Sequence, residues 1–219
     1  MGMGEGRYIV VEGPIGVGKT SLVKLLAESF EAKTILERID ENPFLPKFYK
    51  EPAKYAFQTQ LFFLLTRYQQ QQEILQGDLF RQGLLCDYLF AKDRIFASIN
   101  LNQDELVLYD WIYELLDRRT VKPDLVIYLQ APVSVLLKRI RKRAVPYEKD
   151  IEAEYVEKVS KAYANFFFQY NETPLLVVNT SSIDFVKRDA DLKNLIREIH
   201  NTDKGVRYLT IGPDVDPIS

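Results

Sequence analysis

The stretch RYIVVEGPIGVGKTSLVKLLAESF, residues 7–30, joins an apolar run, a glycine-rich turn and a helical pattern. Its central part, Gly13-Pro-Ile-Gly-Val-Gly-Lys-Thr20, matches the pattern GxxxxGK[ST] in full. The run before it predicts a buried strand, and the residues after it predict a helix. This strand–loop–helix context predicts a phosphate-binding loop, in which backbone N–H groups and the positive end of the helix hold phosphate oxygens.

The motif assigns nucleotide contacts to single residues. Lys19 is predicted to hold the β- and γ-phosphates of a nucleoside triphosphate, and Thr20 to bind a magnesium ion. The remaining cofactor-binding residues predicted for this loop are Gly13, Gly16, Gly18 and Ser21. A chance glycine-rich turn is the alternative, and the flanking strand and helix argue against it.

Short apolar runs elsewhere predict the rest of the sheet. The predicted strands are 7–12, 34–36, 84–87, 124–130 and 175–179. The predicted helices are 19–30, about 51–76, about 89–119, 133–143, about 151–170 and 183–199. Strands that alternate with helices predict an α/β fold, a five-stranded parallel sheet flanked by helices. We expect one domain over residues 1–200, with an irregular tail over 201–219.

Composition and charge limit the classes of partner. The 219 residues carry a net charge of −2, which argues against binding a nucleic-acid polymer or an anionic membrane. With one cysteine and one histidine, we expect neither an intramolecular disulfide bond nor a zinc site. We expect a cytoplasmic protein. The apolar stripes between residues 51 and 119 either cover the sheet or form a homodimer interface.

Two further features bear on phosphate chemistry. Asp87 ends the third predicted strand, where an acid could help to bind magnesium; a helix N-cap is the alternative. Arg139 and Arg143 are four residues apart and share one face of a predicted helix, which suits a lid that neutralises phosphate charge. A solvated charged helix is the alternative, and Arg141 and Lys142 are predicted to face solvent.

These features, together with LERIDENPFLPKFYKEPAKYAFQTQLFFLLTRYQQ (36–70), the lid RIRKR (139–143) and Asp184-Phe185, resemble the deoxyribonucleoside kinases. That group includes deoxycytidine, deoxyguanosine and bacterial deoxyadenosine kinases. The resemblance runs from the phosphate loop to about Phe185. It implies a P-loop kinase with a short arginine-bearing lid, which uses ATP and Mg²⁺ to phosphorylate the 5′-hydroxyl of a deoxyribonucleoside.

The resemblance also implies functions for single residues. Glu37 falls on the general base for the 5′-hydroxyl, and acts with Lys19, Arg139 and Arg143 in catalysis. Tyr49 falls on the contact to the sugar 3′-hydroxyl, with Glu148 as its acidic partner. Gln60 falls on the base-recognising glutamine, with Gln58 as a nearby alternative. Asp184 and Phe185 fall near the adenine of ATP.

Arg67 and Asp93 bear on the preferred base. Family members with this pair resemble the branch that accepts cytidine and purines, which favours a purine or cytosine base over thymine. A structural ion pair is the alternative explanation for the same two residues.

The chain departs from the family pattern at two places. Asp87-Tyr88-Leu89 stands where relatives have Asp/Glu-Arg-Ser, and Arg143-Ala144-Val145 stands where relatives have Arg-Gly-Arg. A neighbouring cation could replace the missing charge, the candidates being Lys92, Arg94 and Arg141. Otherwise the acceptor could be a nucleoside monophosphate, as in thymidylate-kinase-like enzymes, or the protein could be a catalytically weak nucleotide sensor.

Overall fold

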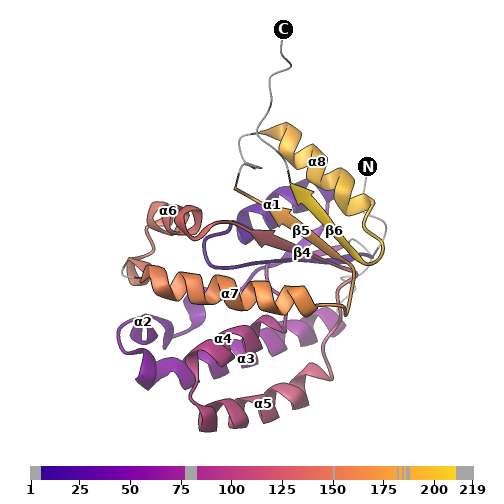
Figure 1. Cartoon of the computed structure of the whole chain (residues 1–219). Coiled ribbons are helices and arrows are strands. Elements are labelled where there is room, and N and C mark those ends of the chain that lie inside the picture. Colours follow the sequence, from indigo (N-terminus) through magenta and orange to yellow (C-terminus); the bar gives the residue numbers. More distant parts are fainter. Residues whose placement is uncertain are drawn as a thin grey trace.

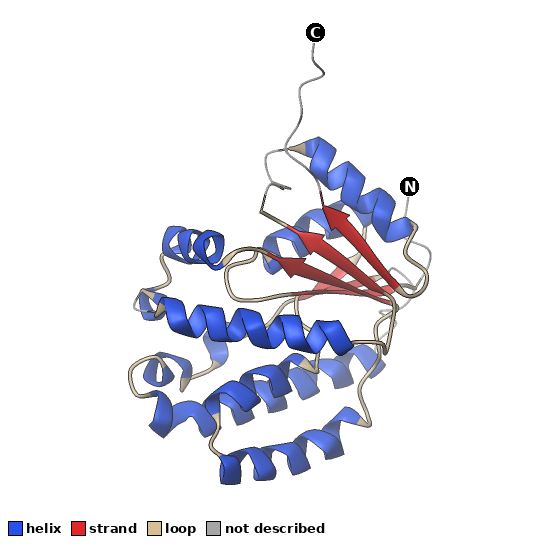
Figure 2. Ribbon diagram, viewed as in Figure 1, coloured by secondary structure: helices blue, strands red, loops and turns tan. Residues whose placement is uncertain are grey.

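The computed structural model describes residues 6–76, 83–149, 151–181, 183, 185 and 188–210. These residues form one sheet of six parallel strands in the order β2-β3-β1-β4-β5-β6. The strands are β1 (Tyr8–Glu12), β2 (Lys33–Ile35), β3 (Leu84–Cys86), β4 (Leu125–Gln130), β5 (Leu175–Asn179) and β6 (Val206–Thr210). Figure 2 shows helices on both faces of the sheet. The α/β class and the parallel sheet predicted from the sequence are confirmed.

The sixth strand corrects two predictions, five strands and an irregular segment from residue 201. β6 pairs with β5 in parallel, with Val206 opposite Leu175. It is one of the two edge strands of the sheet, and all of its residues except Leu209 are exposed. An edge strand covered so little lacks the unbroken apolar run by which the sequence predicts the inner strands. Residues 211–219 lie outside the described residues.

The helices agree with the predicted positions except at residues 45–48, where no helix was predicted, at the start of the last helix, predicted at 183 and found at Asp189, and between residues 89 and 119. They are α1 (Lys19–Phe30), α2 (Leu45–Phe48), α3 (Pro52–Gln76), α4 (Lys92–Asn100), α5 (Gln103–Asp117), α6 (Val133–Arg143), α7 (Ala153–Gln169) and α8 (Asp189–His200). The single helix expected at 89–119 is two helices, because Asn102 starts α5 with a capping box. Its side chain accepts from the Glu105 N–H at 3.0 Å, and the Glu105 carboxylate accepts from the Asn102 N–H at 3.1 Å.

Two cores pack against the two faces of the sheet. Ile9 and Val11 of β1 contribute to a core shared with α1, α6 and α8. Tyr8 and Val10 point to the opposite face and contribute to a core shared with α3, α4 and α7. This alternation along β1 explains why its residues are all buried. Figure 1 shows α8 on one side of the sheet and α7 on the other.

The arrangement of the strands places the site. The segments that follow the carboxyl ends of β1, β2, β3 and β5 carry Lys19, Glu37, Asp87 and Thr180. In open parallel sheets the ligand site lies at this edge. None of the helices in the described part of the chain is long and apolar enough to cross a membrane.

Candidate active site

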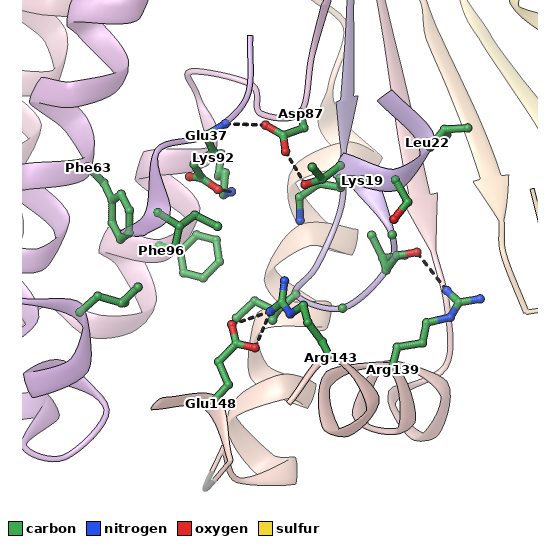
Figure 3. Close-up of a pocket in the computed structure, with 18 of the residues that line it drawn as sticks. Lys19, Leu22, Glu37, Phe63, Asp87, Lys92, Phe96, Arg139, Arg143 and Glu148 are labelled. Carbon is green, nitrogen blue, oxygen red and sulfur yellow. Dashed lines mark hydrogen bonds and ion pairs between the residues drawn. The ribbon is translucent and has the colours of Figure 1, made fainter. Parts of the chain in front are cut away.

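A cavity of about 630 Å³ lies at the carboxyl edge of the sheet, within the usual range for small-molecule sites. The phosphate loop, the segment after β2, α3, α4 and the lid helix α6 all contribute to its lining. Figure 3 shows Lys19 and Asp87 on one side of the cavity and Glu37, Lys92 and Phe96 on the other, with Arg143 below. The predicted site residues that line the cavity are Gly16, Gly18, Lys19, Thr20, Ser21, Glu37, Tyr49, Gln60, Arg67, Asp87, Arg139, Arg143, Glu148 and Phe185.

The phosphate loop has the backbone geometry that the motif predicts. Gly13 and Gly16 have φ values of 151° and 81°, in the region that favours glycine. A Cβ atom at Gly13 would lie 2.5 Å from the Leu129 carbonyl oxygen, and one at Gly16 would lie 2.7 Å from Cγ1 of Ile140. The loop therefore packs directly against β4 and the lid helix.

Lys19 is held inside the loop. Its Nζ donates to the carbonyl oxygens of Gly13, at 2.7 Å, and Pro14, at 3.3 Å. Burial, and then the charge of Lys92, lowers the pKa of Lys19 to about 8. The ammonium group has carbonyl partners that a phosphate oxygen could replace, as the predicted function requires.

Glu12 ends β1 directly before the loop, and its carboxylate is fully buried. Oε1 accepts from the Gly13 N–H at 2.8 Å and from the Tyr163 hydroxyl at 3.1 Å. Oε2 accepts from the Leu89 N–H at 2.8 Å. The carboxylate therefore ties the start of the phosphate loop to the segment after β3 and to α7.

Asp87 connects the phosphate loop to Glu37. Its Oδ2 accepts from the Thr20 hydroxyl at 2.5 Å, and its Oδ1 accepts from the Glu37 backbone N–H at 2.7 Å. The alternative of a helix N-cap is excluded, because α4 begins at Lys92 with Ala91 as its N-cap. The adjacent hydroxyl and carboxylate oxygens of Thr20 and Asp87 fit Mg²⁺, which commonly takes one or two protein oxygens and completes its shell with phosphate and water.

Glu37 lies across the cavity in a fork of two cations. Its Oε1 accepts from Arg67, through Nε at 3.0 Å and through a closer Nη2 contact. Its Oε2 accepts from Lys92 Nζ at 2.8 Å. Burial alone would raise the pKa of the Glu37 carboxyl, but Arg67 and then Lys92 hold this pKa well below its usual range. Glu37 is therefore a carboxylate at neutral pH.

The Arg67–Asp93 pair predicted as either base contact or structural ion pair is an ion pair in the structure. Arg67 donates through Nη1 to Oδ1 of Asp93, so its guanidinium bridges Asp93 and Glu37. Arg67 lines the cavity, whereas the fully buried Asp93 lies outside the lining, behind Arg67. Any effect of Asp93 on a ligand therefore passes through Arg67.

Gln60 rather than Gln58 faces the cavity. The side chain of Gln60 is buried among the lining residues, and Gln58 is exposed and outside the lining. The lining also contains Phe63 and Phe96, which are not among the site residues predicted from the sequence. Helical spacing is the signal that could have found them, because Phe63 is three residues from Gln60 and Phe96 is four residues from Lys92.

The two lid arginines have different contacts. Arg139 donates to the Val17 carbonyl at 2.9 Å and to the hydroxyl and carbonyl oxygens of Thr180 at 3.0 Å. Arg143 donates to both carboxylate oxygens of Glu148. Both arginines line the cavity, as their shared helix face predicts. Lys142, expected to face only solvent, also lines it, because the end of α6 lies at the cavity mouth.

The predicted sugar contacts are close to each other and to the lid. Tyr49 lines the cavity and stacks on Tyr147, with 5.8 Å between the ring centroids. Glu148 is next to Tyr147 in the chain, and it is buried against Arg143. Phe185 lines the cavity. Asp184 lies outside the described residues.

Among the three cations considered for the missing charge, Lys92 is the one at the cavity. Its side chain is 6% exposed and contacts Glu37. Arg94 pairs instead with Asp110 at the surface, at 3.0 Å, and Arg141 is exposed and outside the lining. Tyr88 is fully buried in the core beside α3, α4 and α7. Its side chain therefore does not fill the place in the cavity that a cation would take.

Comparison with known proteins agrees with this geometry. A sequence model of the deoxynucleoside kinase family matches residues 9–203. The chain is 36% identical over 202 residues to the deoxyguanosine kinase of Bacillus subtilis (strain 168), and the alignment covers 90% of this chain and 98% of that protein. It is 30% identical over 207 residues to the deoxyadenosine kinase of Lactobacillus acidophilus, and this alignment covers 88% of this chain and 94% of that protein.

Solved structures support the fold. A structure of deoxyadenosine kinase from M. mycoides with bound dCTP has a TM-score of 0.77 to this chain at 24% identity, covering 89% of this chain and 99% of that one. The six-stranded parallel sheet and the phosphate loop therefore form a P-loop kinase fold. Taken with the sequence matches, this means that the chain belongs to the deoxynucleoside kinase family of phosphotransferases.

Proposed function

We propose that this kinase transfers the γ-phosphoryl group of ATP to the 5′-hydroxyl of a deoxyribonucleoside, with purine and cytosine bases favoured over thymine. One observation carries the proposal. Asp87 bonds both to the Thr20 hydroxyl and to the Glu37 N–H, so the phosphate loop and the acceptor-side carboxylate face one cavity at a fixed spacing. Holding donor and acceptor in this way supplies much of the rate enhancement in phosphoryl transfer.

Glu37 is the proposed general base. The 5′-oxygen forms the new bond to the γ-phosphorus, the bond to the β,γ-bridging oxygen breaks, and the hydroxyl proton passes to the Glu37 carboxylate. The low pKa of Glu37 makes it a weak base. A weak base suits a loose transition state, in which the hydroxyl proton leaves late and the carboxylate mainly orients the alcohol.

The cations of the loop and the lid neutralise phosphate charge in this proposal. Lys19 and Arg143 act on the phosphates directly, and Arg139, which bonds to the Val17 carbonyl, fixes the lid helix on the loop. Thr20 and Asp87 would hold Mg²⁺, which neutralises phosphate oxygens when bound. Tyr49 and Glu148 would hold the sugar 3′-hydroxyl.

The base preference rests on Gln60 and Arg67. The amide of Gln60 offers a donor and an acceptor at the cavity wall, which suits the edge of a purine or of cytosine. The relatives named above are a deoxyguanosine kinase and a deoxyadenosine kinase, which supports purine acceptors. We also propose that the enzyme acts in the cytoplasm, which cell fractionation with an antibody against the chain would test.

The test is an activity panel. Purified protein with ATP and Mg²⁺ is offered deoxyguanosine, deoxyadenosine, deoxycytidine, thymidine and their monophosphates, and the products are separated by chromatography. We expect turnover of the first three nucleosides and its loss in Glu37→Gln by roughly 10²- to 10⁴-fold. Glu41→Gln, an exposed glutamate four residues away, is the matched control and should keep wild-type activity. Turnover of monophosphates alone, or of thymidine above all others, would contradict the proposal.

A further inference from the structure

We propose that Lys92 is a positioning residue for phosphoryl transfer, which fixes the Glu37 carboxylate in the orientation that accepts the acceptor hydroxyl. The proposal rests on the function proposed above. Lys92 Nζ lies 2.8 Å from Oε2 of Glu37, and the two side chains are 6% and 7% exposed. Figure 3 shows the two side chains together at the cavity wall, facing the side that carries Lys19 and Asp87.

The position of Lys92 is unfavourable for a lysine unless Glu37 is its partner. Lys92 is the first residue of α4, where the helix dipole disfavours a cation. Its side chain is buried, and the repulsion between Lys92 and Lys19 contributes to the lowered pKa of Lys19. A residue that breaks several local preferences at once is most often found at a functional site.

Arg67 alone holds only one of the two carboxylate oxygens of Glu37. Its guanidinium contacts Oε1 of Glu37 and is drawn on the other side to Asp93. Lys92 contacts the other oxygen, Oε2, so the plane of the carboxylate is set by two cations from two helices. A carboxylate oxygen has two lone pairs, so Oε2 retains one for the acceptor hydroxyl. Phe96, with its ring 5.7 Å from Lys92 Nζ, packs beside the ammonium group.

The charged groups that face Glu37 come from several elements. They are Arg67 of α3, Lys92 of α4, Lys19 of the phosphate loop and Asp87 after β3. Removing Lys92 therefore leaves Arg67 as the one direct cationic contact of Glu37 among the described residues. We expect the Glu37 carboxylate to be more mobile in such a variant.

The experiment compares Lys92→Met, Lys92→Arg and Arg94→Met. Arg94 is on the same helix but pairs with Asp110 at the surface, so Arg94→Met removes a cation without touching Glu37. We expect Lys92→Met to lower kcat roughly 100-fold while KM for the deoxynucleoside changes less than about threefold. We expect kcat of Lys92→Arg to be at least about tenfold higher than kcat of Lys92→Met, because the cation is retained. Arg94→Met should behave as wild type.

A second measurement separates positioning from a structural function. The Glu37 carboxyl is followed by ¹³C NMR in glutamate-labelled protein, and its resonance is assigned by its absence in Glu37→Gln. We expect its chemical shift at neutral pH to change in Lys92→Met and to stay in place in Arg94→Met. An unchanged kcat in Lys92→Met, or a Glu37 resonance identical to that of the wild type, overturns the proposal.

Two further outcomes are interpretable. If Lys92→Met fails to fold, Lys92→Met combined with Glu37→Gln should fold, since the neutral amide no longer needs a buried cation, and Lys92→Arg then decides the kinetic question. If the wild-type protein phosphorylates no nucleoside, the proposed function fails. In that case the Glu37 resonance at neutral pH still decides whether Lys92 holds this carboxylate in place.

Discussion

The ammonium group of Lys19 lies in surroundings that oppose its charge. Burial and the nearby Lys92 lower its pKa to about 8, while the acids Glu12, Glu37 and Asp87 act in the opposite direction. The lysine of a phosphate loop is useful only when protonated, because it binds phosphate as a cation. The pKa of this residue therefore sets an upper pH for ATP binding.

We expect KM for ATP to rise as the pH passes through about 8, the pKa of Lys19. The sign follows from the shift: the pKa is lowered, so Lys19 loses its proton, and its attraction for phosphate, within the alkaline range where an ordinary lysine remains charged. Initial rates from about pH 7 to about pH 9 measure this, with KM for the deoxynucleoside as the internal control. In Lys92→Met the rise should move to higher pH. A KM for ATP that stays level across this range would contradict the assignment.

At the scale of single elements, the lid helix α6 holds two arginines with separate functions. Arg139 is bonded to the Val17 carbonyl and to Thr180, so it fastens α6 to the phosphate loop and to the end of β5. Arg143 is 45% exposed and bonds to Glu148, a partner that a phosphate group can replace. The helix is thus fixed near its middle while its last turn remains available to the ligand.

We expect Arg143→Met to lower kcat by roughly 10- to 1000-fold, because a guanidinium next to the transferred phosphoryl group is lost. Arg141→Met is the matched control: Arg141 is two residues away on the same helix, exposed and outside the cavity lining. Steady-state kinetics at saturating ATP measure both variants. Equal losses in the two variants would show that the general charge of the helix matters, and not the position of Arg143.

The elements and the site were predictable to different degrees. The phosphate loop and α6 follow from local pattern, since turn glycines and helical periodicity are encoded in neighbouring residues. The convergence of Lys19, Asp87 and Glu37 was also predictable, because each follows a predicted strand and parallel strands end at one edge of the sheet. The edge strand β6 was missed because its side chains are exposed. Side-chain partners, such as Lys92 for Glu37, depend on packing between distant segments and are not contained in any local pattern.

At the scale of the whole molecule, α3 and α5 carry apolar side chains on their outer surfaces. The exposed large apolar residues of these two helices are Leu65, Leu75, Val107, Leu108, Trp111 and Leu115. Trp111 and Leu115 are 65% and 68% exposed, and they lie four residues apart on one face of α5. Exposed apolar surface of this kind marks interaction sites, and supports the homodimer predicted through the helices between 51 and 119.

If the predicted homodimer forms through this surface, we expect Trp111→Glu to make the protein monomeric, because each copy would bury an unpaired carboxylate in the interface. Light scattering coupled to size-exclusion chromatography measures the mass. Tyr208→Glu is the control: Tyr208 is 76% exposed on β6, an edge strand of the sheet, and this variant should remain dimeric. A wild-type protein that elutes as a monomer at micromolar concentration would contradict the proposal.

The hydrogen bonds of Glu12 show how much of the chain a short motif depends on. Its partners Gly13, Leu89 and Tyr163 are 1, 77 and 151 residues away in sequence. An excised peptide of residues 7–30 would retain every letter of the phosphate-loop pattern, yet its Glu12 would lack two of these three partners. Transplanting the motif into another protein would therefore require the transfer of its distant supports as well. The loop is local in sequence, but its shape is a property of the whole chain.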